Sequence, residues 1–157
     1  MNDMHERWMN EAIELAKENV KTGGGPFGSV IVRNNELVAR AGNRVTPDDD
    51  PTAHAEIVAI RRACEKLGSF QLSGCTLYSS CEPCPMCLGA IYWSRLDRVF
   101  YCGTREDAAE AGFDDAFIYN EISRDPAQRT IPMERCSKDK AASIFEAWAK
   151  YEERVEY

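Results

Sequence analysis

Long apolar runs are absent from this chain of 157 residues. No stretch approaches the about 18 consecutive apolar residues of a membrane-spanning helix, so we expect neither a span nor a membrane partner. The first residues, Met1 to Arg7, are acidic and polar and lack the basic start and the apolar stretch of a secretory signal. Internal repeats, linkers and low-complexity segments are also missing. The sequence therefore predicts a single globular domain, residues 1–157, that works in the cytoplasm.

A disulfide framework is missing as well. The chain has seven cysteines, an odd number without the spacing of a secreted scaffold. Together with the missing signal, this favours a reducing compartment, where cysteines serve as metal ligands or as small apolar core residues. The seven are Cys64, Cys75, Cys81, Cys84, Cys87, Cys102 and Cys136.

Positive charge is in short supply, since 19 basic residues against 26 acidic ones give a formal net charge of −7. Proteins that bind a phosphate backbone usually present a basic face. The pair Arg61-Arg62 could contribute to such a face, but it sits close to Glu65, and the last turn of the chain is acidic again. The balance disfavours a nucleic-acid partner without forbidding a local basic patch.

What is present is an ordinary globular balance of 44% apolar and 29% charged residues. Apolar residues at helical spacing alternate with short β-compatible runs, and Asn34-Asn35 joins two of these runs as a hairpin turn. Residues 107–129 are the least legible stretch, for which we expect short helical turns and loop. The pattern predicts a layered α/β domain with a mixed sheet. The expected elements are helices over 3–20, 51–67, 85–93 and 141–153 and strands over 29–33, 36–41, 75–79 and 98–102.

Two short segments carry metal-binding chemistry. A His-Ala-Glu segment begins at His54, and about thirty residues later Pro-Cys-Pro-Met-Cys places its cysteines at Cys84 and Cys87. One histidine and two thiolates supply three ligands for Zn²⁺ and leave the fourth tetrahedral position open for water, as in catalytic sites. The cysteines lie one turn apart at an expected helix start, and the histidine lies in the expected first turn of another helix. Glu56 is then placed to move the protons of that water.

The same residues are also compatible with simpler roles. A single histidine is more often a core or surface residue than a ligand, and a single Cys-x-x-Cys can be redox-active or structural. Cys81 extends the pattern to a double Cys-x-x-Cys, which with His54 could form a closed Cys₃His site that leaves no room for water. The joint occurrence with Glu56 and Pro83 favours the open catalytic site, with Cys81 at the end of a strand close to the metal.

His-x-Glu followed by Pro-Cys-x-x-Cys is typical of the zinc-dependent nucleobase deaminases. The wider segments 50–57 and 82–90 are similar to two groups of the cytidine-deaminase-like superfamily, the tRNA adenosine deaminases and the small bacterial guanine deaminases. Three further segments favour the second group: residues 24–28 (Gly-Gly-Pro-Phe-Gly), residues 108–115 (Ala-Ala-Glu-Ala-Gly-Phe-Asp-Asp) and the final Glu156-Tyr157. The chain resembles the small bacterial guanine deaminases over nearly its full length.

This resemblance implies a three-layer α/β/α cytidine-deaminase-like fold with a central mixed sheet. It also implies hydrolysis of guanine to xanthine and ammonia with Zn²⁺ as cofactor, in which a metal hydroxide attacks C2 and Glu56 carries a proton from water to the ring. An aspartate of the Gly-Phe-Asp-Asp segment is expected to help protonate the leaving amine. By position this is Asp115, with Asp114 as its neighbour, and for either residue a solvated acid or a helix cap is the alternative.

A purine substrate needs a flat apolar slot and a few polar contacts. Phe27 and Trp93 are candidates for the walls of the slot, and each could equally be a core residue. Asn43 resembles a substrate-contacting asparagine of the superfamily, and its amide both donates and accepts hydrogen bonds. Its alternative is a turn residue after a strand.

The family further implies a homodimer in which the C-terminal segment of one subunit crosses to cover the pocket of the other, so that Tyr157 reaches the partner's active site. The local sequence alone indicates an amphipathic terminal helix with a frayed tail. Among substrates, guanosine or an aminotriazine with a similar amidine edge is an alternative to guanine. A tRNA adenosine deaminase would share the core motifs but would need a cationic groove around its pocket. The non-enzyme alternative is a binding or structural protein with a closed zinc site.

Overall fold

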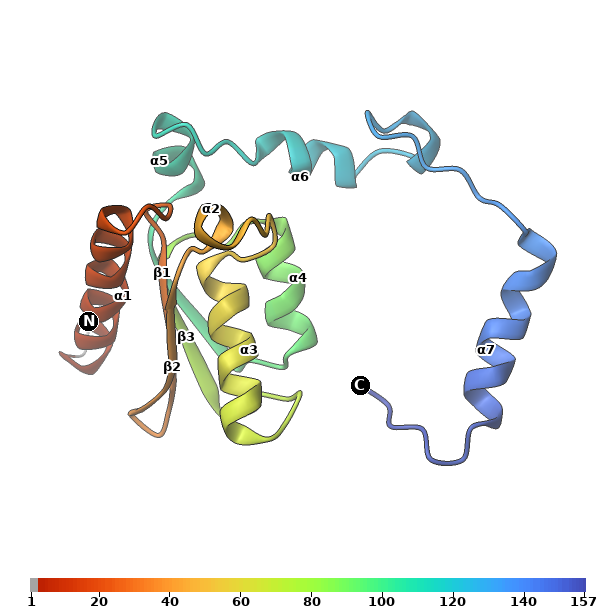
Figure 1. Ribbon diagram of the computed structural model, residues 1–157, viewed down its shortest axis with the longest axis horizontal. Helices are drawn as coiled ribbons and strands as arrows, with labels where there is room; N and C mark the ends of the chain where they lie inside the picture. Colours follow the sequence, from red (N-terminus) through yellow and green to blue (C-terminus); the bar gives the residue numbers. More distant parts are fainter. Residues whose placement is uncertain (1–2) are drawn as a thin grey trace. The chain divides into compact units, whose positions relative to one another are not determined.

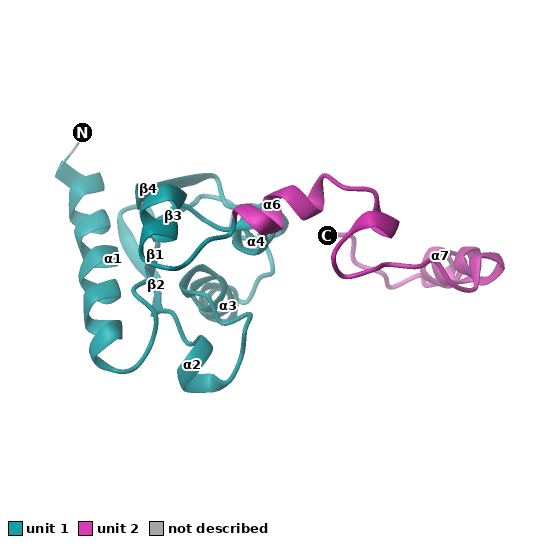
Figure 2. Ribbon diagram, turned by 90° about the horizontal axis from the view of Figure 1, so that it is seen from above, with its two compact units in different colours: residues 1–115 teal, residues 116–157 magenta. Residues whose placement is uncertain are grey.

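The computed structural model describes residues 3–157. The chain divides into two compact units, unit 1 (Met1–Asp115) and unit 2 (Ala116–Tyr157), which Figure 2 shows in different colours. Within the described part of the chain, no helix combines the length and the apolar character that crossing a membrane requires.

Unit 1 is built on one mixed sheet of four strands. Its order is β2-β1-β3-β4, in which β1 pairs antiparallel with both β2 and β3, and β3 pairs parallel with β4. The parallel pair needs a crossover, and the helix between β3 and β4 supplies it. The mixed sheet expected from the sequence is confirmed. The strands are β1 (Gly28–Arg33), β2 (Glu36–Gly42), β3 (Cys75–Cys81) and β4 (Arg98–Gly103).

Helices cover both faces of this sheet. Figure 1 shows α1 (Asp3–Lys21) on one face and α3 (Ala55–Leu67) and α4 (Pro85–Trp93) on the other. Because successive side chains of a strand point to opposite faces, the run Val30-Ile31-Val32 of β1 serves both layers. Val30 and Val32 pack with Trp8 of α1, while Ile31 packs with the α3 side. The three-layer α/β/α arrangement with a central mixed sheet is therefore confirmed.

The turns of unit 1 follow from residues that tolerate positive φ. Asn34 and Asn35 link β1 to β2 with φ of 51° and 61°, as a tight hairpin turn requires. Gly68 ends α3 in the left-handed conformation, with φ of 61°. Helix α4 has the bounds expected from the sequence, and β3 and β4 extend beyond the expected ends by two residues and one residue.

The start of α3 was predicted wrongly. The sequence indicated a helix from Pro51, but α3 begins at Ala55, and a short helix α2 (Val45–Asp48) lies in the loop before it. The carboxylate of Asp50 accepts hydrogen bonds from both the backbone N and the hydroxyl of Thr52, at 2.8 Å and 2.7 Å. This local turn competes with the helix and keeps residues 50–54 outside it.

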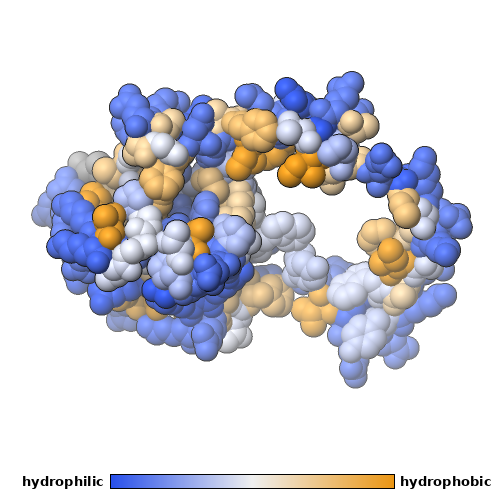
Figure 3. Space-filling view, turned by 45° about the horizontal axis from the view of Figure 1, so that its top comes forward, coloured by the Kyte–Doolittle hydropathy of each residue, from blue (hydrophilic) through white to orange (hydrophobic). Residues whose placement is uncertain are grey.

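Unit 2 consists of short helical segments without a buried residue of its own. They are α6 (Ala116–Ile122), η1 (Pro126–Gln128), η2 (Lys138–Lys140) and α7 (Ala141–Lys150). Short helical turns and loop were expected for residues 107–129, and α5 (Arg105–Glu110), α6 and η1 confirm this. Helix α7 ends three residues before the expected Glu153 because Tyr151 is extended, with ψ of 108°. Apolar side chains of unit 2 reach its surface, as the orange atoms of Figure 3 indicate.

Candidate active site

Two helix starts bring the expected metal ligands together. His54 is the N-cap residue of α3, Cys84 is the N-cap residue of α4, and Cys87 lies in the first turn of α4. His54 was expected inside the first helical turn, and its position one residue before the helix is a small correction. The ligand atoms of the three residues all lie within 4.8 Å of one another. The partial positive charge of both helix starts favours thiolates at this point.

The distances fit a tetrahedral zinc ion. Nδ1 of His54 lies 3.5 Å from Sγ of Cys84 and 3.5 Å from Sγ of Cys87. Zinc bonds of about 2.0 Å to nitrogen and about 2.3 Å to sulfur, at a tetrahedral angle, would put these atoms about 3.5 Å apart. Among the described residues, the cluster contains three candidate protein ligands and not a fourth. The set therefore matches an open, three-ligand zinc site.

Cys81 does not join this cluster. It ends β3, as expected, and its Sγ lies 3.5 Å from the backbone oxygen of Thr104. Burial raises the pKa of the Cys81 thiol to about 11, so that this residue is a protonated thiol at neutral pH. The geometry therefore disfavours the closed Cys₃His site.

Without a metal ion, hydrogen bonds among the three candidate ligands shift their pKa values. A hydrogen bond with Cys87, supported by His54, lowers the pKa of Cys84 to about 4. The same hydrogen bond, together with burial, raises the pKa of Cys87. The hydrogen bond to Cys84 also raises the pKa of His54. A metal bound to all three would displace the protons that now hold them together.

Glu56 lies beside the ligands and is buried, with 6% of its surface exposed. One carboxylate oxygen accepts a hydrogen bond from the Ser79 hydroxyl of β3 at 3.1 Å, and the other lies 3.5 Å from Sγ of Cys87. Burial raises the pKa of Glu56 toward neutral pH. A carboxyl group with these properties can accept and return a proton.

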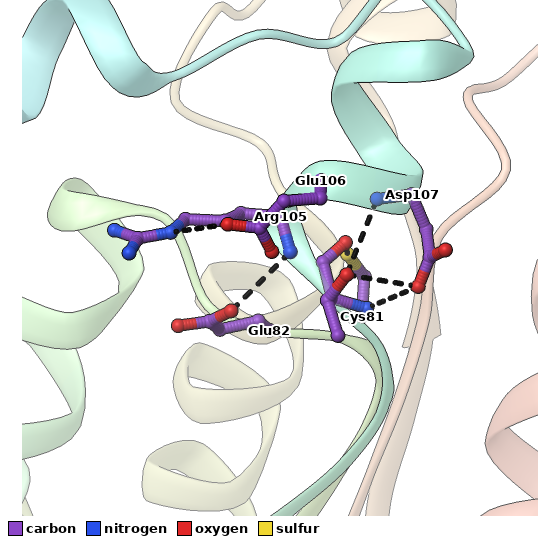
Figure 4. Close-up of polar contacts among 6 residues, drawn as sticks. Cys81, Glu82, Arg105, Glu106 and Asp107 are labelled. Atoms are coloured by element: carbon purple, nitrogen blue, oxygen red, sulfur yellow. Dashed lines mark hydrogen bonds and ion pairs between the residues drawn. The ribbon is translucent and has the colours of Figure 1, made fainter.

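Helix α5 begins beside the end of β3, and polar contacts hold it there (Figure 4). Thr104 and Asp107 form a reciprocal capping box at its start, and the backbone N of Arg105 donates to Glu82 at 3.2 Å. Glu82 follows directly after Cys81 and precedes the ligand segment. The start of α5 is thereby fixed next to the metal ligands.

The segment after α5 returns toward the ligands. Gly112 has φ of 93° and turns the chain, and the N–H of Phe113 donates to Ala108 at 2.9 Å. Asp115 is half-buried, and burial together with the negative charge of Cys84 raises its pKa. Asp114 is exposed. Asp115 thus lies close enough to Cys84 for the charge of that thiolate to act on its carboxyl group.

An aromatic pair connects the two loops of unit 1 that carry the expected substrate contacts. The rings of Phe27 and Phe113 meet edge to face, with centroids 4.9 Å apart and an interplanar angle of 86°. Sequence reasoning selected Phe27 and missed Phe113, although Phe113 stands in the Gly-Phe-Asp-Asp segment that was used for the family resemblance. An aromatic residue next to two acids was the available signal.

Two other expected substrate residues take different places. Trp93 is the last residue of α4 and is 63% exposed, so it lies at the end of the helix opposite to Cys84, about 13 Å along the axis. The slot-wall role expected for Trp93 stays a prediction. Tyr157 ends unit 2 and is 70% exposed.

Asn43 is buried next to the loop that carries Phe27. Its side-chain oxygen accepts hydrogen bonds from the backbone N of Val45 at 3.2 Å and of Gly25 at 3.4 Å. Asn43 therefore does stabilise the turn that follows β2, which was the alternative to a substrate contact. It leaves the NH₂ of the amide as the group that a substrate could meet.

A family model described as the cytidine and deoxycytidylate deaminase zinc-binding region matches residues 2–103, which include all three candidate ligands and Glu56. The chain belongs to this family. Membership agrees with the open three-ligand geometry, because zinc-binding deaminase domains hold the metal through histidine and cysteine.

Similarity to individual proteins extends beyond the family region. The chain is 53% identical to the guanine deaminase of Bacillus subtilis (strain 168) over 154 residues, which are 98% of this chain and 99% of that protein. The X-ray structure of guanine deaminase from Bacillus subtilis matches with a TM-score of 0.96 at 52% identity, covering 100% of this chain and 99% of that one. The resemblance to the small bacterial guanine deaminases, expected from the sequence, is confirmed.

A second group of relatives matches over a shorter length. The tRNA-specific adenosine deaminase of Bacillus subtilis (strain 168) is 45% identical over 96 residues, which are 61% of this chain and 60% of that protein. This similarity leaves more than a third of both chains unmatched. The full-length match to a guanine deaminase therefore separates the two groups.

Proposed function

We propose that the protein hydrolyses guanine to xanthine and ammonia. The observation that carries this proposal is the 53% identity to a guanine deaminase across 98% of the chain, which extends past residue 103, where the family region ends. One water molecule supplies the new carbonyl oxygen at C2, and the amino group leaves as ammonia. The acidic net charge of −7 supports a small-molecule purine substrate over a nucleic acid.

His54, Cys84 and Cys87 would hold a zinc ion, which supplies an activated water at neutral pH when it is bound. Glu56 would take up a proton at the carboxylate oxygen that faces the ligands. Its other oxygen is held by Ser79, so the side chain has one orientation in which to do so. Burial keeps bulk water away from this exchange and raises the pKa of the carboxyl group, which supports delivery of the proton to the ring.

Asp115 would help to protonate the leaving amine. Its half-buried position and its pKa, raised by burial and by the charge of Cys84, support a carboxyl group that takes up a proton more readily than an exposed aspartate does. Asp114 is its exposed neighbour, and we propose that it contributes polar contact at the rim of the pocket.

The purine ring would lie against the aromatic pair of Phe27 and Phe113, and the NH₂ of Asn43 would donate to an acceptor on the purine edge. This assignment adds Phe113 to the slot walls expected at Phe27 and Trp93. The edge-to-face contact supports this assignment because it places the loop of Phe27 against the loop of Phe113 within unit 1.

We also propose that the whole chain acts as one deaminase domain of a cytoplasmic homodimer, in which unit 2 of one subunit covers the pocket of the other and Tyr157 reaches that pocket. Unit 2 supports this because it buries none of its residues while it exposes large apolar side chains. Examples are Phe145 at 72% and Ile144 at 68% exposure.

A substrate panel tests the activity directly. Purified, zinc-loaded protein is incubated with guanine, guanosine, an aminotriazine, adenine, cytosine, cytidine and tRNA, and products are separated by chromatography. We expect xanthine from guanine as the main product. Absence of xanthine from metal-loaded protein overturns the proposal.

The partial similarity to a tRNA-specific adenosine deaminase favours tRNA editing as the second candidate. Binding of tRNA measured across salt concentrations separates the two functions, because phosphate contacts give a steep salt dependence. We expect weak binding at physiological salt.

A further inference from the structure

Asn19, near the end of α1, is a polar residue with 9% of its surface exposed. Its side-chain NH₂ donates two hydrogen bonds, to the carbonyl oxygens of Gly25 and Asn43, both at 2.7 Å. Its own backbone oxygen accepts from the N–H of Gly24 at 3.0 Å. Asn19 thereby joins the segment that precedes β1 to the residue that follows β2. We name these hydrogen bonds the Asn19 clasp.

Two glycines make room for the amide of Asn19. A Cβ atom at Gly24 would overlap with Nδ2 of Asn19, and a Cβ atom at Gly42 would overlap with its Oδ1. Both glycines lie on the segments that the clasp joins. With Asn19 in place, each of these positions therefore accommodates only a residue without a side chain.

The clasp leads directly to the proposed substrate contacts. The N–H of Phe27 donates to Gly25 at 2.8 Å, and the N–H of Asn43 donates to Phe27 at 3.0 Å. Gly25 in turn donates to the side-chain oxygen of Asn43 at 3.4 Å. The ring of Phe27 and the amide of Asn43 are thus set by one closed network that begins at Asn19.

We propose that Asn19 is a positioning residue for substrate binding, which acts through Phe27 and Asn43 without touching the substrate. The proposal rests on the function proposed above. The NH₂ of Asn19 holds two carbonyl oxygens close together that would otherwise repel each other. Without this donor, the carbonyl of Asn43 loses a buried hydrogen bond, and the two segments move apart.

The kinetic test compares Asn19→Asp and Asn19→Ala with wild type. Aspartate has the size of asparagine but replaces the donor by an oxygen. We expect both variants to raise KM for guanine about tenfold, while kcat changes less than about threefold and zinc content stays the same. Lys17→Ala, on the exposed face of the same helix, is the control and should leave KM unchanged.

A mutant cycle separates positioning from a general loss of stability. If Asn19 acts through Phe27 and Asn43, Asn19→Ala should raise KM much less in a background that carries both Phe27→Ala and Asn43→Ala than in wild type. Equal effects of Asn19→Ala in both backgrounds would overturn the proposal.

Amide hydrogen exchange provides a readout that does not depend on turnover. We expect Asn19→Ala to speed the exchange of Phe27 and Asn43, while the amides of β1 and β3 keep wild-type rates. Unchanged exchange at Phe27 and Asn43 overturns the clasp itself, and faster exchange with an unchanged KM overturns its role in substrate binding. If wild-type protein forms no xanthine, the function proposed above fails, and the exchange rates still decide whether Asn19 holds the two segments.

Discussion

The two units differ in where their apolar residues are placed. Unit 1 buries apolar clusters on both faces of its sheet, with Trp8 and Val30 on one side and Ile31 and Leu77 on the other. Unit 2 has no buried residue, and its apolar side chains are exposed, as Trp148 is at 43%. Unit 1 therefore has a core of its own, while unit 2 leaves its apolar side chains exposed, as expected of a segment that packs against a partner under the proposed function.

The two units also differ in their proposed roles, since unit 1 carries the catalytic candidates and unit 2 is proposed to cover the pocket. The three candidate ligands, the buried carboxylate and Asp115 all belong to unit 1. Unit 2 contributes none of them, and its proposed role is to cover a pocket. Substitutions of these catalytic candidates in unit 1 should accordingly abolish chemistry, whereas substitutions in unit 2 should weaken the proposed enclosure and association.

The largest effect is expected at Glu56. Glu56→Ala and Glu56→Gln should each lower kcat by roughly 10³-fold, because neither side chain can accept a proton from water. Zinc content, measured by metal analysis, should stay at the wild-type level. Glu65→Ala, at an exposed position on the same helix, should behave as wild type. Loss of zinc from the Glu56 variants would contradict a proton-transfer role.

Thiol alkylation compares the two units through their cysteines. Because the pKa of Cys81 is raised to about 11, its thiolate population at pH 8 is about a hundredfold below that of an ordinary thiol. Iodoacetamide should therefore modify exposed Cys136 of unit 2 before Cys81, and the rate at Cys81 should keep rising as the pH approaches 11. Mass spectrometry of peptides gives both rates, and equal rates at pH 8 would contradict the raised pKa of the half-buried Cys81 thiol.

Tyr157→Ala should lower activity about tenfold without changing the thermal stability of unit 1, since the residue is exposed and ends unit 2, whose proposed role is to cover the partner's pocket. Thermal unfolding and guanine turnover test both parts.

Mixing two inactive or weakened variants sharpens this prediction. A heterodimer of Glu56→Ala and Tyr157→Ala subunits would contain one site with an intact Glu56 covered by an intact Tyr157. Mixed protein should therefore regain activity above the sum of the two parents. Strict additivity after subunit exchange would sink the proposed crossing of unit 2.

The smallest effect is expected at the start of α5. Thr104→Ala removes one half of the capping box and should lower the free energy of unfolding by about 1 kcal/mol. Ser123→Ala, in unit 2, removes an exposed hydrogen bond to Asn120 and should change stability by less than about 0.5 kcal/mol. Urea unfolding of both variants measures the difference, and an equal loss would show that the two units do not differ in this respect.

Much of unit 1 could be predicted from the sequence because its signals are local. The Asn34-Asn35 turn, the Gly68 helix end and the bounds of α4 depend on conformational preferences of the residues themselves. The grouping of His54, Cys84 and Cys87 could be predicted because residue type and spacing already restrict the chemistry, and the structure brings their ligand atoms within 4.8 Å of one another. The start of α3 could not, since the carboxylate of Asp50 captures Thr52 in a turn that periodicity does not reveal.

Contacts between segments far apart in the chain could not be predicted from the sequence. The pairing of Phe27 with Phe113 depends on the path of the chain through α5, which no local signal in the sequence indicates. Asn19 carried no motif and was expected only as part of an amphipathic helix, because its partners are backbone carbonyls that any residue type provides. The place of Tyr157 stays a prediction.

Neither His54 nor Cys84 forms a side-chain hydrogen bond to the helix that it precedes. Both positions are usually taken by serine, threonine or aspartate, which tie down the first free amides of a helix. Here that anchoring is absent, and the two side chains converge on the candidate metal site. Removal of zinc should then show itself twice, as lost turnover and as earlier fraying of α3 and α4, which would expose the protein to proteolysis.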